Sequence, residues 1–231
     1  MLDFSPVSTL PADRRKTMVD CQLRTFDVTD HEVIEAFLAT PREDFVAAPD
    51  LAVVYSDALQ TVASGEARRV LLAPMALARL LQGANIDKGA RVLDVGGGTG
   101  YSAAILSQIA GSVVALESDA GFTAAASANA ARLGLENLRA ITGPLDSGAS
   151  AEGLFDVILI NGAVEEGLDG LFAQLAPGGR LLCVMKAAGQ GGRYGKATRY
   201  DRIGSDVSPR FLFDAAAQVM PGFERKARFL F

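Results

Sequence analysis

The sequence of 231 residues predicts an α/β fold: a three-layer structure around a mostly parallel sheet with an antiparallel C-terminal strand, preceded by an N-terminal helical segment. Three observations lead to this prediction. From residue 91 onward, short apolar runs alternate with helical patterns, which is typical of strands buried on both faces. A glycine cluster follows the first of these runs. Before residue 85, apolar residues recur mainly at helical spacing.

The predicted strands are continuous apolar runs of strand length. They lie at residues 91–95, 113–117, 138–141, 157–160 and 180–185. Helices are expected between these runs, through Ile105 and Ile109, over residues 120–133 and near residues 165–175.

The first part of the chain gives helical signals. Residues 13–28 form a predicted helix after an extended arm. Thr29 and Glu32 have the spacing of a capping box, which predicts a second helix ending before Pro41. Pro74 suits the first position of a further helix, because proline lacks the N–H that a first turn leaves unpaired.

The last part of the chain predicts two more strands. Residues 187–195 are rich in glycine and predict a loop. Residues 196–203 and 223–231 follow as predicted strands, joined through a turn at Pro221 and Gly222. Since no long helix separates them, they predict an antiparallel pair that closes the sheet.

Composition and charge exclude several classes of function. The chain is 49% hydrophobic, with a formal net charge of −5, which argues against broad binding of nucleic acids or anionic membranes. The apolar runs are too short to span a membrane. Cys21, Cys183 and His31 cannot form a Cys/His zinc site, so no metal is expected. A single disulfide stays possible, but reduced thiols and a cytoplasmic location are the expectation.

The most informative segment runs from Val92 to Tyr101, where glycines at 96, 98 and 100 separate a strand from a helix. A dinucleotide fingerprint would need glycine at position 101, which is tyrosine. A phosphate-binding P-loop would need a lysine that is absent. The remaining pattern, D-x-G-x-G-x-G, resembles motif I of S-adenosylmethionine-dependent methyltransferases.

This resemblance implies a binding site for S-adenosylmethionine. The loop backbone would hold the amino-acid end, with Asp94 near its ammonium, and Glu117 would accept hydrogen bonds from the ribose diol. The alternative is a structural turn followed by a solvated glutamate. The residues expected to bind the cofactor are Asp94, Gly96, Gly97, Gly98, Thr99, Gly100, Tyr101, Glu117, Ser118, Gly143, Pro144, Leu145 and Asn161.

Two of these assignments keep alternatives. Pro144 stands where many methyltransferases place an acid for the adenine amino group. Either Asp146 replaces that acid, or Pro144 and Leu145 only pack on the ring. Asn161 ends a predicted strand, and it either faces the methyl-donor end or serves as a structural cap.

The whole chain resembles the protein-L-isoaspartate (D-aspartate) O-methyltransferase family over roughly residues 13–231. The matching segments are Met18–Arg24, Val33–Phe37, Pro41–Val46, Tyr55–Asp57, Val92–Tyr101 and Leu175–Leu181. The resemblance implies methylation of the α-carboxyl of isoaspartyl residues for protein repair, with a protein or peptide carboxylate as substrate. It also divides the chain into an N-terminal helical segment with the acceptor-site region (1–85) and a cofactor-binding core (86–231).

One departure from the family concerns the acceptor site. The family carries G-Q-T-I-S-Q-P before the helix that is predicted here to begin at Pro74. An alignment without gaps places Arg69, Val70 and Leu72 at the first Gln, the Thr and the Ser of that motif. A gapped alignment instead uses Gln60 and Thr61. We leave the catalytic residues unassigned and keep three hypotheses: isoaspartyl methylation, methylation of another acceptor, and a binding protein with little activity. Arg68 and Arg69 either bind a carboxylate or are solvated helix charges.

Overall fold

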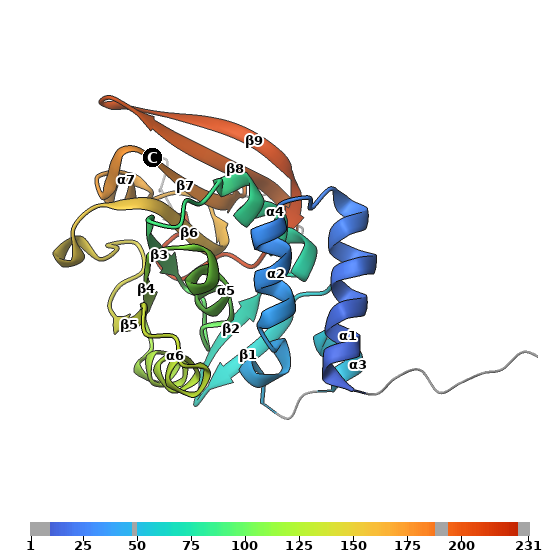
Figure 1. Cartoon of the computed structure of the whole chain (residues 1–231). Coiled ribbons are helices and arrows are strands. Elements are labelled where there is room, and N and C mark those ends of the chain that lie inside the picture. Colours follow the sequence, from blue (N-terminus) through green and yellow to red (C-terminus); the bar gives the residue numbers. More distant parts are fainter. Residues whose placement is uncertain (1–9, 48–49, 188–193, 226–231) are drawn as a thin grey trace, which may run out of the picture.

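The computed structural model describes residues 10–47, 50–187 and 194–225. Its main sheet has seven strands in the order β5-β4-β3-β6-β7-β8-β9 (Figure 1). The strands are β3 (Arg91–Val95), β4 (Ser112–Glu117), β5 (Leu138–Thr142), β6 (Phe155–Val164), β7 (Leu175–Met185), β8 (Tyr194–Ile203) and β9 (Asp206–Ala216). Strands β3 to β7 pair in parallel with one another, whereas β8 pairs antiparallel with both β7 and β9 at one edge. The predicted fold class is confirmed.

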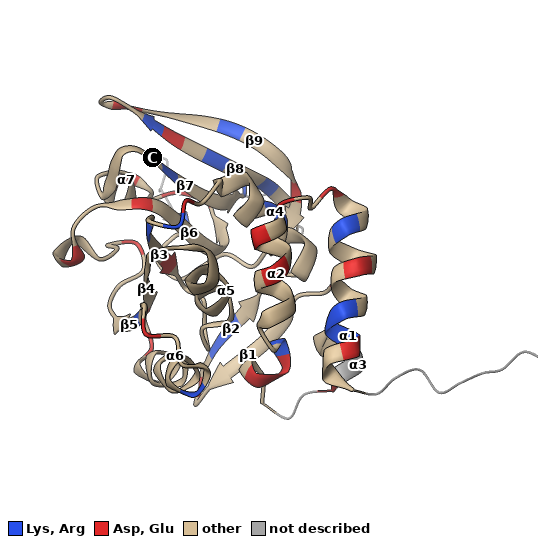
Figure 2. Cartoon of the chain, viewed as in Figure 1, with Lys and Arg blue, Asp and Glu red and all other residues tan. Residues whose placement is uncertain are grey.

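Neighbouring residues of the parallel strands enter two different hydrophobic clusters, one on each face of the sheet. The first face is covered by α5 (Tyr101–Ile109), α6 (Ala120–Leu133) and the N-terminal helices. Helix α5 carries no charged residue and is drawn without blue or red in Figure 2. All of α5 except Gln108 is buried, because this helix lies between the sheet and α2.

The second face has less helical cover than we predicted. The helix expected near residues 165–175 is reduced to α7 (Asp169–Phe172), and β7 already begins at Leu175. The cover is completed by Leu145, Met220 and Phe223, which are all buried against this face. The segment Ala217–Phe223, which follows the last strand, is therefore part of the core.

The N-terminal part contains helices and one hairpin. In chain order its elements are α1 (Pro11–Met18), the π-helical turn η1 (Val19–Leu23), the 3₁₀ turns η2 (Arg24–Phe26) and η3 (Arg42–Phe45) with α2 (His31–Ala39) between them, α3 (Leu51–Val54), β1 (Gln60–Ser64), β2 (Ala67–Leu71) and α4 (Pro74–Ala84). A further 3₁₀ turn, η4 (Ser150–Glu152), lies in the core. The hairpin β1–β2 packs beside α6 at the lower edge of Figure 1.

Two local predictions in the N-terminal part need correction. Arg68 and Arg69 lie on strand β2 and not on a helix. Asp30, and not Thr29, caps α2, accepting hydrogen bonds from the N–H groups of Glu32 (2.9 Å) and Val33 (3.2 Å). Asp30 is the N-cap because it directly precedes the first helical residue, where its carboxylate reaches those two N–H groups.

The second antiparallel strand was also misplaced. It is β9 and not residues 223–231, of which 223–225 lie in irregular structure and 226–231 lie outside the described residues. Pro209 and several charged residues interrupt the apolar pattern that would otherwise predict β9. Proline and charge are nevertheless tolerated on an exposed edge strand.

Both cysteines are free: Cys21 is exposed, contrary to a core-filling role, and Cys183 is buried. Among the described residues, no helix has the length and apolar character needed to cross a bilayer.

Candidate functional site

The glycine loop lies where the connection order of the sheet reverses. Strand β3 pairs with β4 on one side and with β6 on the other, and ligands of open α/β sheets bind in the crevice beyond the strand ends at such a point. The loop after β3 turns through positive φ values at Gly96 (72°), Gly98 (63°) and Gly100 (94°). Other L-residues rarely adopt this conformation, which explains the glycines. We use the name cradle for residues Gly96–Gly100 together with Glu117.

Asp94 ties the floor of the cradle together. Its carboxylate accepts hydrogen bonds from Asn161 Nδ2 (2.8 Å) and Ser102 Oγ (2.7 Å). Asn161 Nδ2 also donates to the carbonyl of Val95 (3.2 Å). Burial raises the pKa of Asp94 to about 6, against the opposing effect of these hydrogen bonds. Asp94 and Asn161, which were both expected to bind the cofactor, thus bind each other.

Glu117 is the acid expected after the glycine loop, at the end of the next strand of the core, which is β4. An arginine binds it in this structure. Arg69 Nε lies 3.2 and 3.1 Å from the two carboxylate oxygens, and Arg69 Nη2 lies 2.9 Å from Oε2. The N–H of Gly98 donates to Oε1 at 2.6 Å, and Arg69 Nη2 donates to Ser118 Oγ at 2.6 Å. The ion pair is buried, with side-chain exposures of 7% for Arg69 and 3% for Glu117.

The hairpin holds Arg69 against the cradle. An added Cβ on Gly98 would lie 3.1 Å from Val62 Cγ2 and 3.3 Å from Arg69 Cβ, so the hairpin touches the loop directly. At the other end, the space beside Gly121 of α6 is taken by Ser64 Oγ. The Arg69 guanidinium also lies 5.4 Å from the ring centroid of Phe122. These contacts explain why a charged strand residue is only 6% exposed.

Met220 fills the crevice between the ends of β3 and β6. A Cβ on Gly96 would overlap Met220 Cε, and a Cβ on Gly162 would overlap its Cγ and Sδ. Two backbone hydrogen bonds fix this position: Ala163 N–H donates to the Gln218 carbonyl (2.7 Å), and Met220 N–H donates to the Ala163 carbonyl (2.9 Å). Sequence reasoning missed Met220, because no local pattern places a residue so distant in the chain over the glycine loop.

The remaining predicted residues separate into two groups. Leu145 is buried near Gly96, while Pro144 and Asp146 are exposed, and Gly143 N–H donates to the Glu117 carbonyl (2.9 Å). The side chains of Thr99 and Tyr101 instead face the N-terminal elements.

The contacts of Thr99 and Tyr101 show this clearly. Thr99 Oγ1 donates to the Phe45 carbonyl (2.6 Å). The Tyr101 ring packs edge-on against Phe37 and Phe45, with the Arg42 guanidinium 4.6 Å from its centroid. The structure therefore does not bring these two side chains together with Glu117.

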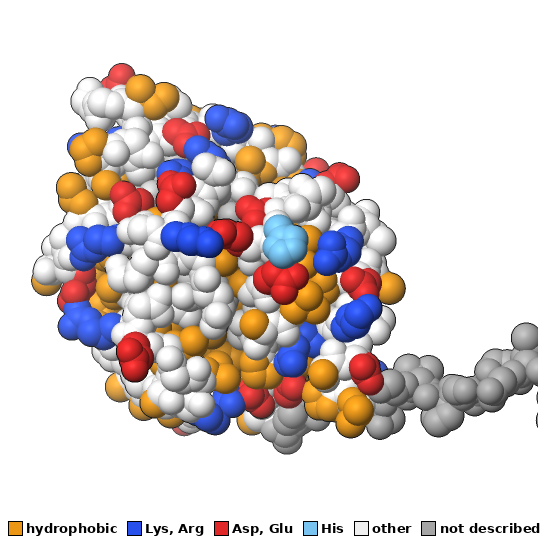
Figure 3. All heavy atoms as spheres, in the orientation of Figure 1, with side chains coloured by type: hydrophobic (Ala, Val, Ile, Leu, Met, Phe, Trp, Pro, Cys, Tyr) orange, Lys and Arg blue, Asp and Glu red, His pale blue; other side chains and the backbone are white. Residues whose placement is uncertain are grey.

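His31 lies far from this chemistry. It is visible on the surface in Figure 3, with 83% of its side chain exposed and Nε2 3.8 Å from Glu35. The only histidine of the sequence therefore lies on the surface.

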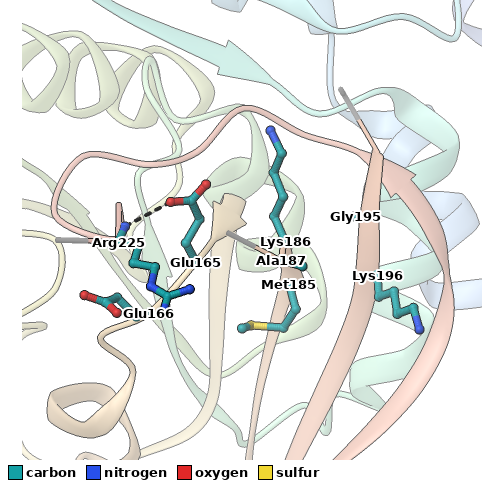
Figure 4. A pocket seen from close by; sticks show the side chains of 8 residues that line it. All are labelled: Glu165, Glu166, Met185, Lys186, Ala187, Gly195, Lys196 and Arg225. Atoms are coloured by element: carbon teal, nitrogen blue, oxygen red, sulfur yellow. Dashed lines mark hydrogen bonds between the residues drawn. The ribbon is translucent and has the colours of Figure 1, made fainter. Parts of the chain in front are cut away.

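A pocket of about 600 Å³ lies beside the crevice. Thr61 and Val70, which are register partners in the hairpin, line it together with Lys186 and Gln218. Lys186 also lines a second pocket of about 470 Å³, where Glu165 accepts a hydrogen bond from Arg225 N–H (2.9 Å). Figure 4 shows the Lys186 side chain extending away from Glu166 and Arg225.

The backbone of the site fits an adenosyl cofactor, but the present arrangement of its side chains does not. The loop at the switch point and the acid one strand later match the expected pattern. However, the oxygens of Glu117 are bound by Arg69, and Met220 takes the space over Gly96. In this arrangement a ribose diol would find no free acceptor oxygen on Glu117.

The sheet order, the antiparallel edge and the glycine loop define the class as a methyltransferase-like α/β fold. Residues 13–206 match the family described as protein-L-isoaspartate (D-aspartate) O-methyltransferase. The chain belongs to this family, whose activity is O-methylation with S-adenosylmethionine.

Individual relatives agree with this assignment. The protein-L-isoaspartate O-methyltransferase of Koribacter versatilis is 38% identical over 77% of this chain and 79% of its own length. That of Thermotoga maritima is 36% identical over 69% of this chain, which spans 52% of that relative. A solved structure of a protein-L-isoaspartate O-methyltransferase has 28% identity and a TM-score of 0.81, covering 91% of this chain and 67% of the other.

Proposed function

We propose that this protein methylates a carboxylate of damaged, isoaspartyl-containing proteins, using S-adenosylmethionine as the methyl donor. The observation that carries the proposal is the family match over residues 13–206, with the glycine loop lying at the switch point of the sheet. The residues proposed to hold the donor are those of the cradle, with Asp94, Ser118, Gly143, Leu145 and Asn161 around it. A repair role and a cytoplasmic location are part of this proposal.

The pocket beside the crevice supports a carboxylate acceptor. Thr61 supplies a hydroxyl directly across the hairpin from Val70, where the family hydroxyl is missing in the ungapped alignment. Lys186 supplies a positive charge and Gln218 completes this side of the lining. A carboxylate is ionised at neutral pH, so this chain needs to position it and does not need a strong base. Charged and hydroxyl donors are the groups that bind such an anion.

A second candidate function is methylation of a different acceptor. Val70 lines the pocket and Leu72 is buried. Both side chains are aliphatic, so neither position offers a hydroxyl to an isoaspartyl carboxylate. This favours an acceptor with a larger apolar part or weak activity toward isoaspartyl peptides.

Methyl transfer from labelled S-adenosylmethionine to matched peptides tests both functions. One peptide carries a single isoaspartyl residue and its control carries aspartyl at the same position. Label incorporated only into the isoaspartyl peptide would support the proposal. Incorporation into neither peptide, together with methylation of another acceptor by the same preparation, would replace it with the second function.

A further inference from the structure

We propose that Arg69 and Met220 form a closure of the cofactor crevice, and that this closure must open before S-adenosylmethionine binds. The proposal rests on the proposed function, since it concerns access to the same site. Arg69 comes from the N-terminal hairpin, and Met220 comes from the segment after the last strand. Two elements outside the core strands thus reach one crevice.

The first half of the closure is the ion pair of Arg69 with Glu117. Glu117 accepts hydrogen bonds from Arg69 Nε and Nη2, from Gly98 N–H and from Ser118 N–H. A carboxylate offers about four acceptor positions, so this set leaves none for two ribose hydroxyls. A diol can reach Glu117 only if the guanidinium withdraws.

The second half is the side chain of Met220, which is 3% exposed. It occupies the space between Gly96 and Gly162, two positions without side chains of their own at the switch point. Methionine is unbranched and adapts its shape, so it can fill this space and can also leave it. The backbone bonds that hold Met220 form a single isolated bridge beside β6, apart from the ladders of the sheet.

Both halves have features of a removable contact. A buried ion pair contributes little net stability compared with apolar packing, because each charge loses its hydration. Opening also leaves the seven-stranded sheet intact, because neither residue belongs to it. The closed form lowers the apparent affinity for a ligand in proportion to the rarity of the open form.

Calorimetric titration with S-adenosylhomocysteine tests the closure without requiring turnover. The variants are Arg69→Gln, Met220→Ala and the double variant. The controls are Arg68→Gln, on the exposed neighbour of Arg69, and Met18→Ala, which removes an equally buried methionine far from the crevice. We expect each test variant to bind about tenfold more tightly than the unaltered chain, and the double variant about a hundredfold. The controls should stay within about twofold.

The outcomes separate the closure from the proposed function. Tight binding by the unaltered chain that neither variant improves would overturn the closure and leave the function standing. A folded double variant that binds no ligand would overturn both. Should Arg69→Gln fail to fold, Met220→Ala and hydrogen exchange decide: saturating ligand must raise amide exchange in residues 217–223 of the unaltered chain, and unchanged exchange there would also overturn the closure.

Discussion

Asp94 shows how one residue joins fold and site. It is the last residue but one of β3, it is fully buried, and it accepts hydrogen bonds from Asn161 and Ser102. A Cβ on Gly97 would overlap Asp94 Oδ2, so the loop closes directly over the carboxylate. Asp94 therefore acts first on the shape of the cradle, whatever the bound ligand.

The pKa of Asp94 leads to a prediction about pH. Because burial raises this pKa to about 6, the folded chain holds a proton that the unfolded chain loses near pH 4. Stability is therefore lost as pH rises from about 4 to 6, by about 3 kcal/mol. Asp94→Asn should remove this loss. Denaturant titrations across that range should show the difference in unfolding free energy between variant and unaltered chain shifting by that amount.

A difference that stays constant between these pH values would show that folding does not raise the pKa of Asp94. Ser102→Ala is a useful comparison, because it removes one hydrogen bond to the carboxylate and leaves the acid in place. It should extend the loss of stability to higher pH rather than remove it, since the bond from Ser102 favours the charged form and lowers the pKa of Asp94.

Lys186 carries a prediction about the acceptor. In the proposed function its charge helps to bind the substrate carboxylate, so Lys186→Met should raise KM about tenfold or more with a smaller effect on kcat, because a charge-assisted hydrogen bond is lost. Lys196→Met is the matched control, as Lys196 lines only the other of these two pockets. Equal effects of both substitutions on steady-state kinetics would show a general charge effect instead.

At the scale of single residues, the sequence indicated which residues form the cradle but not which side chains contact them. The strand, glycine and acid order placed Asp94, the loop and Glu117 correctly at one edge of the sheet, because parallel strand ends meet there. It could not show that Arg69 binds Glu117, since that contact joins residues 48 apart in sequence. It placed Tyr101 at the ligand because the ring follows the last glycine, whereas aromatic packing takes the ring to Phe37 and Phe45.

At the scale of elements, strong periodic signals were reliable and short or charged elements were not. Apolar runs predicted the five parallel strands, since burial on both faces leaves a continuous signal. The hairpin and β9 were missed, because one is short and the other is charged and interrupted by Pro209. The cap of α2 shifted by one residue, from Thr29 to Asp30.

The cap gives a paired prediction for α2. Asp30→Ala should cost about 1 kcal/mol of stability, because two N–H groups of the first turn lose their acceptor. Thr29→Ala should change stability by less than about 0.5 kcal/mol, as its side chain is exposed on the surface. Thermal or denaturant unfolding of both variants measures the contrast. A larger loss for Thr29→Ala would restore the capping box that the spacing suggested.

At the scale of the whole molecule, the two faces of the sheet are covered by different kinds of element. Long helices cover one face, whereas α7 and the segment Ala217–Phe223 complete the other. Phe223 is fully buried, and its carbonyl accepts hydrogen bonds from the N–H groups of Glu165 (3.0 Å) and Glu166 (3.2 Å). The segment that completes this face therefore also carries Met220 into the crevice, which couples packing of the core to access of the cofactor.

The most direct measurement of this coupling follows the methyl resonances of the five methionines in a ¹³C-methyl-labelled chain during titration with S-adenosylhomocysteine. The Met220 methyl should be in contact with Gly96 in the free chain and should shift to the resonance of a solvent-exposed methyl at saturation, while the Met18 resonance is unchanged. A saturated complex in which Met220 keeps its resonance and its contact with the Gly96 amide would show that the crevice binds its ligand without opening.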